Sequence, residues 1–435
     1  MRTSAKVLFK AAVVAIALIL TSRSSHADPA DNQGLEPTSL EEVISEEATS
    51  DENVVEAALP LRKLHGQEKQ QAADLIAQDI TLLETDRTAL LSAIDHSLAY
   101  LQTPKAVNDY REYAVPEITH DRVRRSLQRF RALVTYSSTI ADLQQAIAAE
   151  FDFYQSIGQD AAGSVDFTGY FEPTYRASFT PDETYRYPIY KRPPTLDQWP
   201  QPHPTRAELE GVDGLRSRQG PLKGLELAWL PTRLEAFLVQ VQGSARLEMT
   251  DGSTYSVGYA GRTEYPYTSI GRAIVDDGLI PADELTLPAL MAYFEENPEA
   301  LDCYIPRNDR FVFFKETNGA PATGSLGYPV TAGRSIATDK TLMPPGALAL
   351  IALPLPQINN RSDDRPNSGQ DGTDPLESMA SDSLMTSRLV LDQDTGGAIK
   401  GAGRVDLFVG TGTEAGEVAG QINHPGALYY LLLQE

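Results

Sequence analysis

From about residue 164 the sequence changes its hydrophobic period, and this change limits the possible folds more than any other feature. Before that point, apolar residues recur every three or four positions, which is typical of amphipathic helices. After it, the stretch SVDFTGYFEPTYRAS alternates apolar and polar residues and is rich in tyrosine and phenylalanine, which is typical of strands. We therefore expect an α-helical region followed by a mainly β part.

Two runs of apolar residues with helical spacing predict a helical region over residues 61–160. The first run covers residues 67–101, and the second covers about 121–155. Thr119 precedes the second run and is a candidate N-cap. A region of this kind is expected to serve packing rather than chemistry.

The β part contains several recognisable strands and two short helices. The stretch AFLVQVQGSARLEMTDGSTYSVGYAG predicts a strand, a turn at Asp251-Gly252 and a second strand. Helices are expected in TSIGRAIVDDG and LTLPALMAYFEENP, and further strands in DRFVFFKE, SRLVLDQD, GRVDLFVGTG and GALYYLLLQE. Residues 357–386 are polar and predict a disordered insert.

The first 27 residues predict a signal peptide. Arg2, Lys6 and Lys10 form a basic start, residues 11–20 are all apolar, and Ser25-His26-Ala27 fits a small-x-small cleavage site. Ten apolar residues are half of the roughly 20 that a membrane-spanning helix needs. The acidic stretch 28–60 that follows predicts a solvated linker.

The charge and cysteine content exclude some classes of partner. With 37 Lys and Arg against 60 Asp and Glu, the chain carries a formal net charge of −23, which repels the phosphates of nucleic acids. Cys303 is the only cysteine in the sequence, so it has no partner for an internal disulfide, and we expect it to be a small buried residue. The six histidines lack the spacing of a metal site, and we expect neither metal nor cofactor.

Three aspartates beside turns are candidates for acid–base chemistry: Asp339, Asp394 and Asp406. A carboxyl group held beside apolar walls favours its protonated form, so it can donate a proton and later accept one. Aspartate near glycine is also ordinary turn chemistry, which is the alternative for each of them. Asp394 begins an Asp-Thr-Gly triplet, but aspartic proteases need two such aspartates and the sequence has one triplet.

Residues 166–270 combine many tyrosines with amide and hydroxyl side chains. Such groups suit a groove that stacks against sugar rings and hydrogen-bonds them, although tyrosines also fill the two faces of a sheet. The candidate substrate-binding residues are Tyr170, Gln242, Gly243, Ser244, Tyr259 and Tyr265.

Seven blocks of the sequence, in order, resemble the membrane-bound lytic murein transglycosylase A family with its C-terminal three-aspartate domain. They are FTGYFEPTYRA, YPIYKRP, VQGSARLEMTDGSTYSVGYAGR, SIGRAIVDDG, FVFFKE, RSIATDKTLMPPGALALI and DTGGAIKGAGRVDLFVGTGTEAG. The resemblance implies a double-psi β-barrel made of residues 161–186 and 307–435. It also implies an inserted small β-domain, residues 187–306, with the substrate groove between the two.

By the same resemblance, Asp406 is the catalytic acid and base, and Asp394 and Asp339 support it. The implied enzyme is a peptidoglycan lytic exotransglycosylase, a glycosidic bond lyase that uses no water. It would cleave the β-1,4 bond between N-acetylmuramic acid and N-acetylglucosamine and form a 1,6-anhydro sugar. The residues themselves leave open whether cleavage is endo or exo. A non-catalytic peptidoglycan-binding protein and an ordinary hydrolase are the alternatives.

The implied partners are peptidoglycan glycan strands, and the implied location is the periplasm or cell envelope. The chain departs from the family name in one respect, because no cysteine follows the predicted signal peptide to carry a lipid. We therefore expect a protein that is soluble after signal cleavage and not lipid-anchored.

Overall fold

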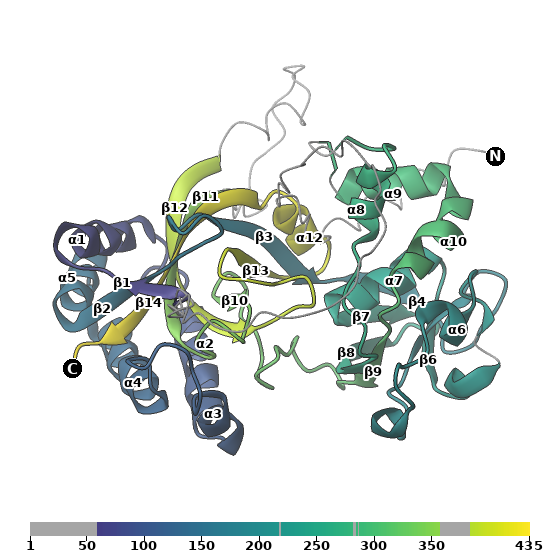
Figure 1. Ribbon diagram of the computed structural model, residues 1–435, viewed down its shortest axis with the longest axis horizontal. Helices are drawn as coiled ribbons and strands as arrows, with labels where there is room; N and C mark the ends of the chain where they lie inside the picture. The colour runs from purple at the N-terminus through teal and green to yellow at the C-terminus, as the bar shows by residue number, and fades with distance from the viewer. Residues whose placement is uncertain (1–58, 217–218, 282–283, 286, 357–382) are drawn as a thin grey trace, which may run out of the picture.

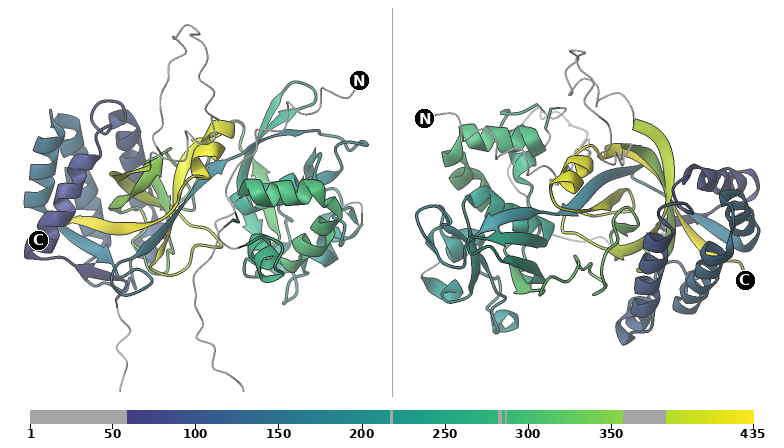
Figure 2. Two further views of the ribbon diagram at one scale, coloured as in Figure 1. Left: turned by 90° about the horizontal axis from the view of Figure 1, so that it is seen from above. Right: turned by 180° about the vertical axis from the view of Figure 1, so that it is seen from behind.

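The computed structural model describes residues 59–216, 219–281, 284–285, 287–356 and 383–435. A barrel of strands lies in the middle of the molecule, with the N-terminal helices at one end and a second group of sheets and helices at the other (Figures 1 and 2). The predicted signal peptide and nearly all of the predicted acidic linker lie outside the described residues. Residues 357–382 of the predicted insert do so too, but the prediction of disorder is wrong for residues 383–386, which begin strand β12.

The described N-terminal helices lie within the range predicted to be helical. They are α1 Gly66–Asp74, α2 Arg87–Leu101, α3 Pro104–Asp109, α4 His120–Tyr136 and α5 Ile140–Glu150, with a 3-10 turn η1 at Leu75–Gln78. Thr119 caps α4 as expected, because its side chain accepts a hydrogen bond from the backbone N–H of Arg122. Buried apolar residues on α2 and α4, such as Ile94 and Phe130, face the barrel core.

The second helical run ends earlier than predicted. α5 stops at Glu150, and residues expected to continue it form strand β2, Phe151–Ser156. Phe151, Phe153 and Tyr154 are buried there, and β2 pairs with β1 on one side and β14 on the other. Pairing along both edges outweighs the local helical pattern, so the helical region ends near residue 150 rather than 160.

The described strands of the central sheet follow the order β1-β2-β14-β11-β12-β10-β13-β3, and β14 also pairs with β3. This extra pairing closes six of the strands into a barrel. Their bounds are β3 Val165–Glu172, β10 Ser335–Ala337, β11 Leu348–Pro356, β12 Ser383–Asp394, β13 Arg404–Thr411 and β14 Asn423–Leu433, with β1 at Leu61–Lys63. β11 is almost wholly buried because barrel and helices cover both of its faces.

A second, four-stranded sheet has the order β4-β7-β8-β9, with a two-stranded β5-β6 sheet beside it. Its strands are β4 Thr174–Ala177, β7 Ser244–Met249, β8 Thr254–Arg262 and β9 Val312–Glu316, and the smaller sheet is β5 Tyr187–Tyr190 and β6 Glu226–Leu230. The helices of this part are α6 Arg206–Glu210, α7 Arg233–Gln242, α8 Ile270–Asp276, α9 Leu287–Glu296 and α10 Leu301–Tyr304, whereas α12 Thr413–Ala419 packs against β3 and β13 of the barrel. Short 3-10 turns lie at η2 Leu196–Gln198, η4 Gly220–Leu222, η5 Pro298–Ala300 and η6 Ile305–Arg307. β4 and β9 lie outside the predicted range 187–306, so this part extends further at both ends.

The strand predicted before the turn at Asp251-Gly252 is wrong in its first half, AFLVQVQ, because these residues belong to helix α7, whereas its second half is strand β7. A capping box joins Thr232 to Glu235 at its start, and Gly243 adopts a left-handed conformation (φ +81°) just after its end. Two good end signals fix a helix despite the β-branched residues inside it. The turn and second strand are confirmed, since β7 and β8 form an antiparallel hairpin.

Two ionic contacts, one partly and one fully buried, join the parts of the molecule. Glu172, at the end of β3, accepts hydrogen bonds of 2.9 Å from Arg246 of the second sheet and from Thr411 of β13. Arg334 of the barrel donates to Asp79 of the helical region at 2.5 and 3.0 Å, and both side chains are buried. These contacts hold the second sheet and the helices against the barrel.

Two further observations concern the chain as a whole. Among the described residues, no helix combines the length and apolarity needed to cross a membrane. Cys303 is exposed rather than buried as predicted, because α10 turns Leu301 and Tyr304 inward and Cys303 outward.

Candidate active site

Asp406 lies near the start of β13, between two other strands of the barrel. Its backbone is opposite Thr168 of β3 on one side and Ala337 of β10 on the other. Thr168 donates a 2.5 Å hydrogen bond to Oδ1 of Asp406, and Arg404 Nη2 lies 3.1 Å from the same oxygen. Among the described residues no hydrogen bond reaches Oδ2, and Asp406 lines the groove described below. One carboxyl oxygen is thus held and the other is free for chemistry.

Asp394 ends β12, and its carboxylate is held by three donors. Oδ1 accepts hydrogen bonds of 2.8 Å from the backbone N–H groups of Ser325 and Thr395, and Oδ2 accepts one of 2.9 Å from the Tyr170 hydroxyl. Burial raises the pKa of Asp394 above its usual value, even though these hydrogen bonds favour the ionised form. Both oxygens of Asp394 are therefore already engaged.

Asp339 supports the loop between Asp394 and Asp406 rather than the groove itself. Its Oδ1 accepts hydrogen bonds from the backbone N–H and the hydroxyl of Thr341, at 3.1 and 2.7 Å, and its Oδ2 accepts one of 3.0 Å from the N–H of Gly401. Burial opposes ionisation, but these hydrogen bonds outweigh it and lower the pKa of Asp339. Gly401 has φ +83°, a conformation that favours glycine, so the loop turns where Asp339 holds it.

A groove of about 1130 Å³ lies between the barrel and the second sheet. Its lining contains eight of the nine predicted site residues: Asp394, Asp406, Tyr170, Gln242, Gly243, Ser244, Tyr259 and Tyr265. The ninth, Asp339, is not part of the lining. The structure therefore brings both walls of the predicted site together, from residues up to 236 positions apart in the chain.

The second wall owes its shape to the junction of α7 and β7. Gln242 ends the helix, Gly243 turns the chain and Ser244 begins the strand. Tyr259 on β8 is 49% exposed, so its ring offers a free face to the groove. The hydroxyl of Tyr265 instead donates to the backbone carbonyl of His203 at 2.5 Å, which fixes that ring at the edge of the groove.

Sequence reasoning missed two residues that contact Asp406, Thr168 and Arg404. Arg404 Nη2 also donates to the Thr168 hydroxyl at 2.6 Å, so the three side chains form one cluster. Arg404 could have been found, because residues two apart on a strand point to the same face. Thr168 could not, since its contact depends on the register of β3 against β13, 238 residues apart.

Comparison with known proteins matches most of this architecture. The family model described as the MltA specific insert domain matches residues 166–315, and the model described as the 3D domain matches residues 334–432. The membrane-bound lytic murein transglycosylase A of Escherichia coli K12 is 32% identical over 283 residues, which cover 64% of this chain and 69% of the relative. The chain belongs to the membrane-bound lytic murein transglycosylase A family. The Vibrio cholerae member is 33% identical over 281 residues, which cover 64% of this chain and 68% of the relative.

Solved structures of this family share the fold. A membrane-bound lytic murein transglycosylase from Agrobacterium tumefaciens is 25% identical, with a TM-score of 0.62 over 82% of this chain and 95% of its own. E. coli MltA with bound chitohexaose is 26% identical, with a TM-score of 0.60 over 81% of this chain and 91% of its own. Membership of the transglycosylase A family, expected from the seven sequence blocks, is thus confirmed. The predicted mainly β fold is confirmed as well.

Proposed function

We propose that this chain is a lytic transglycosylase that cleaves the β-1,4 bond between N-acetylmuramic acid and N-acetylglucosamine in peptidoglycan. Two observations support the substrate class. The relatives are named lytic murein transglycosylases, and an E. coli relative was solved with chitohexaose, an N-acetylglucosamine oligomer. The groove between the barrel and the second sheet also has the mixed aromatic and polar lining that sugars need.

The arrangement of Asp406 carries the mechanistic part of the proposal. When Asp406 is protonated, Oδ1 is the carbonyl oxygen that accepts from Thr168 and faces Arg404, and Oδ2 carries the proton toward the groove. Oδ2 gives this proton to the glycosidic oxygen as the bond from that oxygen to carbon 1 breaks. The ionised Asp406 then takes the proton of the 6-hydroxyl group of the muramic acid as its oxygen closes on carbon 1. The acid is regenerated and no water is consumed.

The surroundings of Asp394 and Asp339 support a single catalytic carboxylate. Most glycoside hydrolases pair an acid with a second carboxylate that acts as base or nucleophile. Asp394 is engaged by Tyr170 and by two backbone N–H groups, and Asp339 is bound to the Gly401 loop and to Thr341. The 6-hydroxyl of the substrate, which is already close to carbon 1, is then the better nucleophile. In this proposal Asp394 and Asp339 are positioning residues.

The fold and location belong to the same proposal. The closed six-stranded arrangement supports a double-psi β-barrel, with the second sheet as its inserted domain. Action on peptidoglycan places the protein in the periplasm or cell envelope, with residues 1–27 as the export signal. The relatives are named membrane-bound, whereas the single cysteine of this chain is Cys303.

Analysis of the digestion products tests the proposal. Purified peptidoglycan strands are incubated with the protein, and the new ends are examined by mass spectrometry before and after borohydride reduction. We expect 1,6-anhydro-N-acetylmuramic acid ends, which are one water lighter than hydrolytic ends and resist reduction. Reducible ends would show a hydrolase and would require a second base. Binding without any product would show a non-catalytic peptidoglycan-binding protein.

A further inference from the structure

Arg310 is a half-buried arginine in the groove lining that has no acidic partner in the described part of the chain. Its Nε is buried without a hydrogen-bond partner, and no ion pair reaches its guanidinium group from a described carboxylate. Almost every other deeply placed arginine of the protein is paired, as Arg334 is with Asp79 and Arg233 with Glu210. A buried cation without a partner is costly, so its position calls for a ligand.

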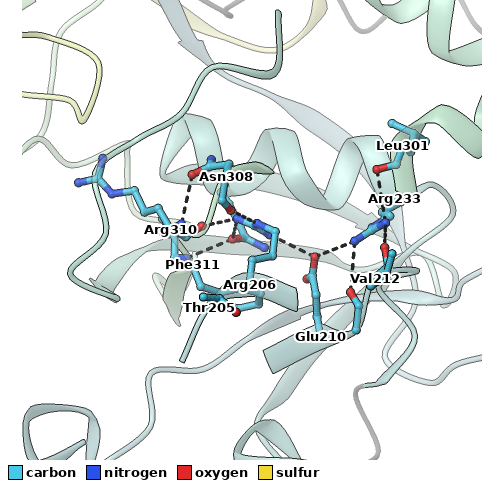
Figure 3. A network of polar contacts seen from close by, with 12 residues as sticks. Thr205, Arg206, Glu210, Val212, Arg233, Leu301, Asn308, Arg310 and Phe311 are labelled. Carbon is cyan, nitrogen blue, oxygen red and sulfur yellow. Dashed lines mark hydrogen bonds and ion pairs between the residues drawn. The ribbon is translucent and has the colours of Figure 1, made fainter. Parts of the chain in front are cut away.

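The backbone of Arg310 is fixed by a buried polar network (Figure 3). Arg206 donates from Nη2 to the carbonyl oxygen of Arg310 at 2.5 Å and from Nε to the carbonyl oxygen of Asn308 at 2.9 Å. The side chain of Asn308 accepts a 3.2 Å hydrogen bond from the N–H of Arg310. In Figure 3 the guanidinium of Arg310 extends away from this network, and no contact drawn there ends on it. The network thus holds the base of the side chain and leaves its charged end to the groove.

The guanidinium crosses the groove to the loop that follows Asp394. A Cβ atom added at Gly397 would overlap Nη1 of Arg310, so any other residue at this position would push the guanidinium aside. Gly397 is three residues after Asp394 and belongs to the barrel wall of the groove. Arg310 lies two residues before the start of β9 and belongs to the opposite wall. The cation is therefore placed between the two walls, beside the loop that joins Asp394 to Asp406.

The surrounding charges are unfavourable for Arg310 when the groove is empty. Burial, together with the positive charge of Arg262, lowers the pKa of Arg310 below its usual value. Arg262 also lines the groove, and its Nη1 donates only to the neighbouring backbone carbonyl of Thr263 among the described residues. An anion placed between these two guanidinium groups would relieve both the repulsion and the desolvation.

The whole groove is less acidic than the rest of the chain. Its described lining has five basic residues, Arg262, Arg310, Lys315, Lys400 and Arg404, and four acidic ones, Asp166, Glu264, Asp394 and Asp406. The complete sequence, in contrast, has 60 acidic and 37 basic residues. A local excess of positive charge in an acidic protein concentrates anionic ligands at that place.

We propose that Arg310, assisted by Arg262, binds a carboxylate of the glycan strand and so makes the groove selective for acidic over neutral N-acetylhexosamine polymers. This inference rests on the proposed function, because it names which group of peptidoglycan the groove recognises. Peptidoglycan offers two sources of that carboxylate: the lactyl group of muramic acid where the peptide has been removed, and the peptide stem where it is present. The planar guanidinium fork matches either carboxylate.

The test measures binding in the Asp406→Asn background, so that no ligand is cleaved. Dissociation constants are determined for three ligands: neutral chitohexaose, strands stripped of peptides, and strands that carry peptides. Arg310→Gln is expected to weaken binding of at least one acidic ligand about tenfold or more and to change chitohexaose binding less than twofold. Arg310→Lys keeps the positive charge but lacks the planar guanidinium group, so it should bind the acidic strands more tightly than Arg310→Gln but less tightly than the parent. Arg307→Gln is the matched control, because it removes an arginine three residues away that pairs with Asp277 and does not line the groove.

Each outcome has a defined meaning. A loss with peptide-free strands identifies the lactyl carboxylate as the ligand, and a loss confined to peptide-bearing strands identifies the stem. Equal losses for chitohexaose and for the acidic strands, or no loss for any ligand, would overturn the assignment. Since the guanidinium of Arg310 has no described partner and is costly in the empty groove, Arg310→Gln should melt at the temperature of its parent or above it. Failure of the proposed function is a separate result, because it appears as absent anhydro products from the intact enzyme while binding is retained.

Discussion

Asp394 and Asp406 lie on opposite sides of the same barrel residue, Ala337. Ala337 of β10 is the backbone partner of Asp394 on the parallel strand β12 and of Asp406 on the antiparallel strand β13. Two strand spacings separate the two aspartates, so their Cα atoms are about 10 Å apart. They are twelve positions apart in the sequence, and residues 395–403 form the loop that Asp339 fixes at Gly401. Because sheet hydrogen bonds set this arrangement, the site is rigid before any substrate binds.

The first prediction concerns Asp406, which we expect to be indispensable. Asp406→Asn should reduce glycan cleavage by roughly 10²–10⁴-fold or more, because an amide has no proton to give and cannot accept one back. The amide oxygen can still accept from Thr168 and Arg404, so the fold should be unchanged. The measurement is the rate of anhydro product formation, with circular dichroism as the check on folding. Turnover comparable to the wild type in a folded mutant would rule out Asp406 as the acid.

The second prediction concerns Asp394, which we expect to matter less than Asp406. Asp394→Asn should lower activity by roughly 10- to 100-fold, as is common for groups that orient a catalytic residue. Tyr170→Phe is the companion variant, since it removes only the 2.9 Å hydrogen bond to Asp394 and keeps the ring packed against Phe408. Its loss should be smaller still. If Asp394→Asn proved more damaging than Asp406→Asn in the same kinetic assay, the roles assigned to the two residues would be reversed.

The third prediction concerns the contact between the helices and the barrel. Asp79→Ala should destabilise the protein by about 3–5 kcal/mol, because the fully buried Arg334 then keeps only the partly exposed Asp86 as an acidic partner, beside a hydrogen bond to the carbonyl of Leu389. Asp79 also accepts a 3.0 Å hydrogen bond from the N–H of Leu389, which is lost as well. The change is measured as a shift of the denaturant midpoint.

The control for this prediction is an exposed pair of the same kind. Arg131 and Asp95 form a 2.6 Å ion pair whose side chains are 43% and 48% exposed. Asp95→Ala should shift the midpoint little, because solvent screens such a pair. Equal effects of Asp79→Ala and Asp95→Ala would show that the buried ion pair does not hold the helices in place.

Local signals in the sequence are enough for much of the fold. Period and turn chemistry predicted the helix α8, the strand β9 and the last three strands, and the structure confirms them. They failed at α7, where a capping box and Gly243 overrode the strand-like content, and at β2, where pairing with β14 decided the conformation. The end signals of α7 are local and could have been recognised, whereas the pairing that decides β2 involves residues far along the chain that a short stretch of sequence does not contain.

The same limit applies to the site. The aspartates were found because glycine-rich turns mark them in the sequence, and the groove tyrosines because they cluster. Thr168 and Arg310 were missed, because each acts across an interface between distant segments. Arg310 reaches Gly397, 87 residues further along the chain, only after the second sheet has folded against the barrel. Residues of this kind are defined by register and packing rather than by local pattern.

The last prediction concerns the pH dependence of stability at Glu235. Glu235 belongs to the capping box of α7, which leads into the groove, and burial raises its pKa from 4.5 to about 7 in the folded protein, although hydrogen bonds from Thr232 oppose the shift. Since the folded pKa lies above the unfolded one, the folded state holds the proton more tightly. The contribution of Glu235 to stability is therefore fully present below about pH 4.5 and is lost as the pH rises through about 7. Glu235→Gln stays neutral and can keep the capping box, so it should stabilise the protein at pH 8 and not at pH 4.

Because Glu235 is only partly buried, we expect a gain of about 1–2 kcal/mol at pH 8, less than the full shift would give. Glu208 provides the matched control, since it closes the same kind of capping box with Thr205 at α6 but is fully exposed, and hydrogen bonds from Thr205 lower its pKa. For Glu208 the sign reverses: its contribution is present above the unfolded pKa and is lost as the pH falls, so Glu208→Gln should not stabilise the protein at pH 8. Melting temperatures of the wild type and both variants between pH 4 and 8 decide the matter. A Glu235→Gln variant that melts with the same pH profile as the wild type would show that this carboxyl group is ionised in the folded protein and that its burial has no such cost.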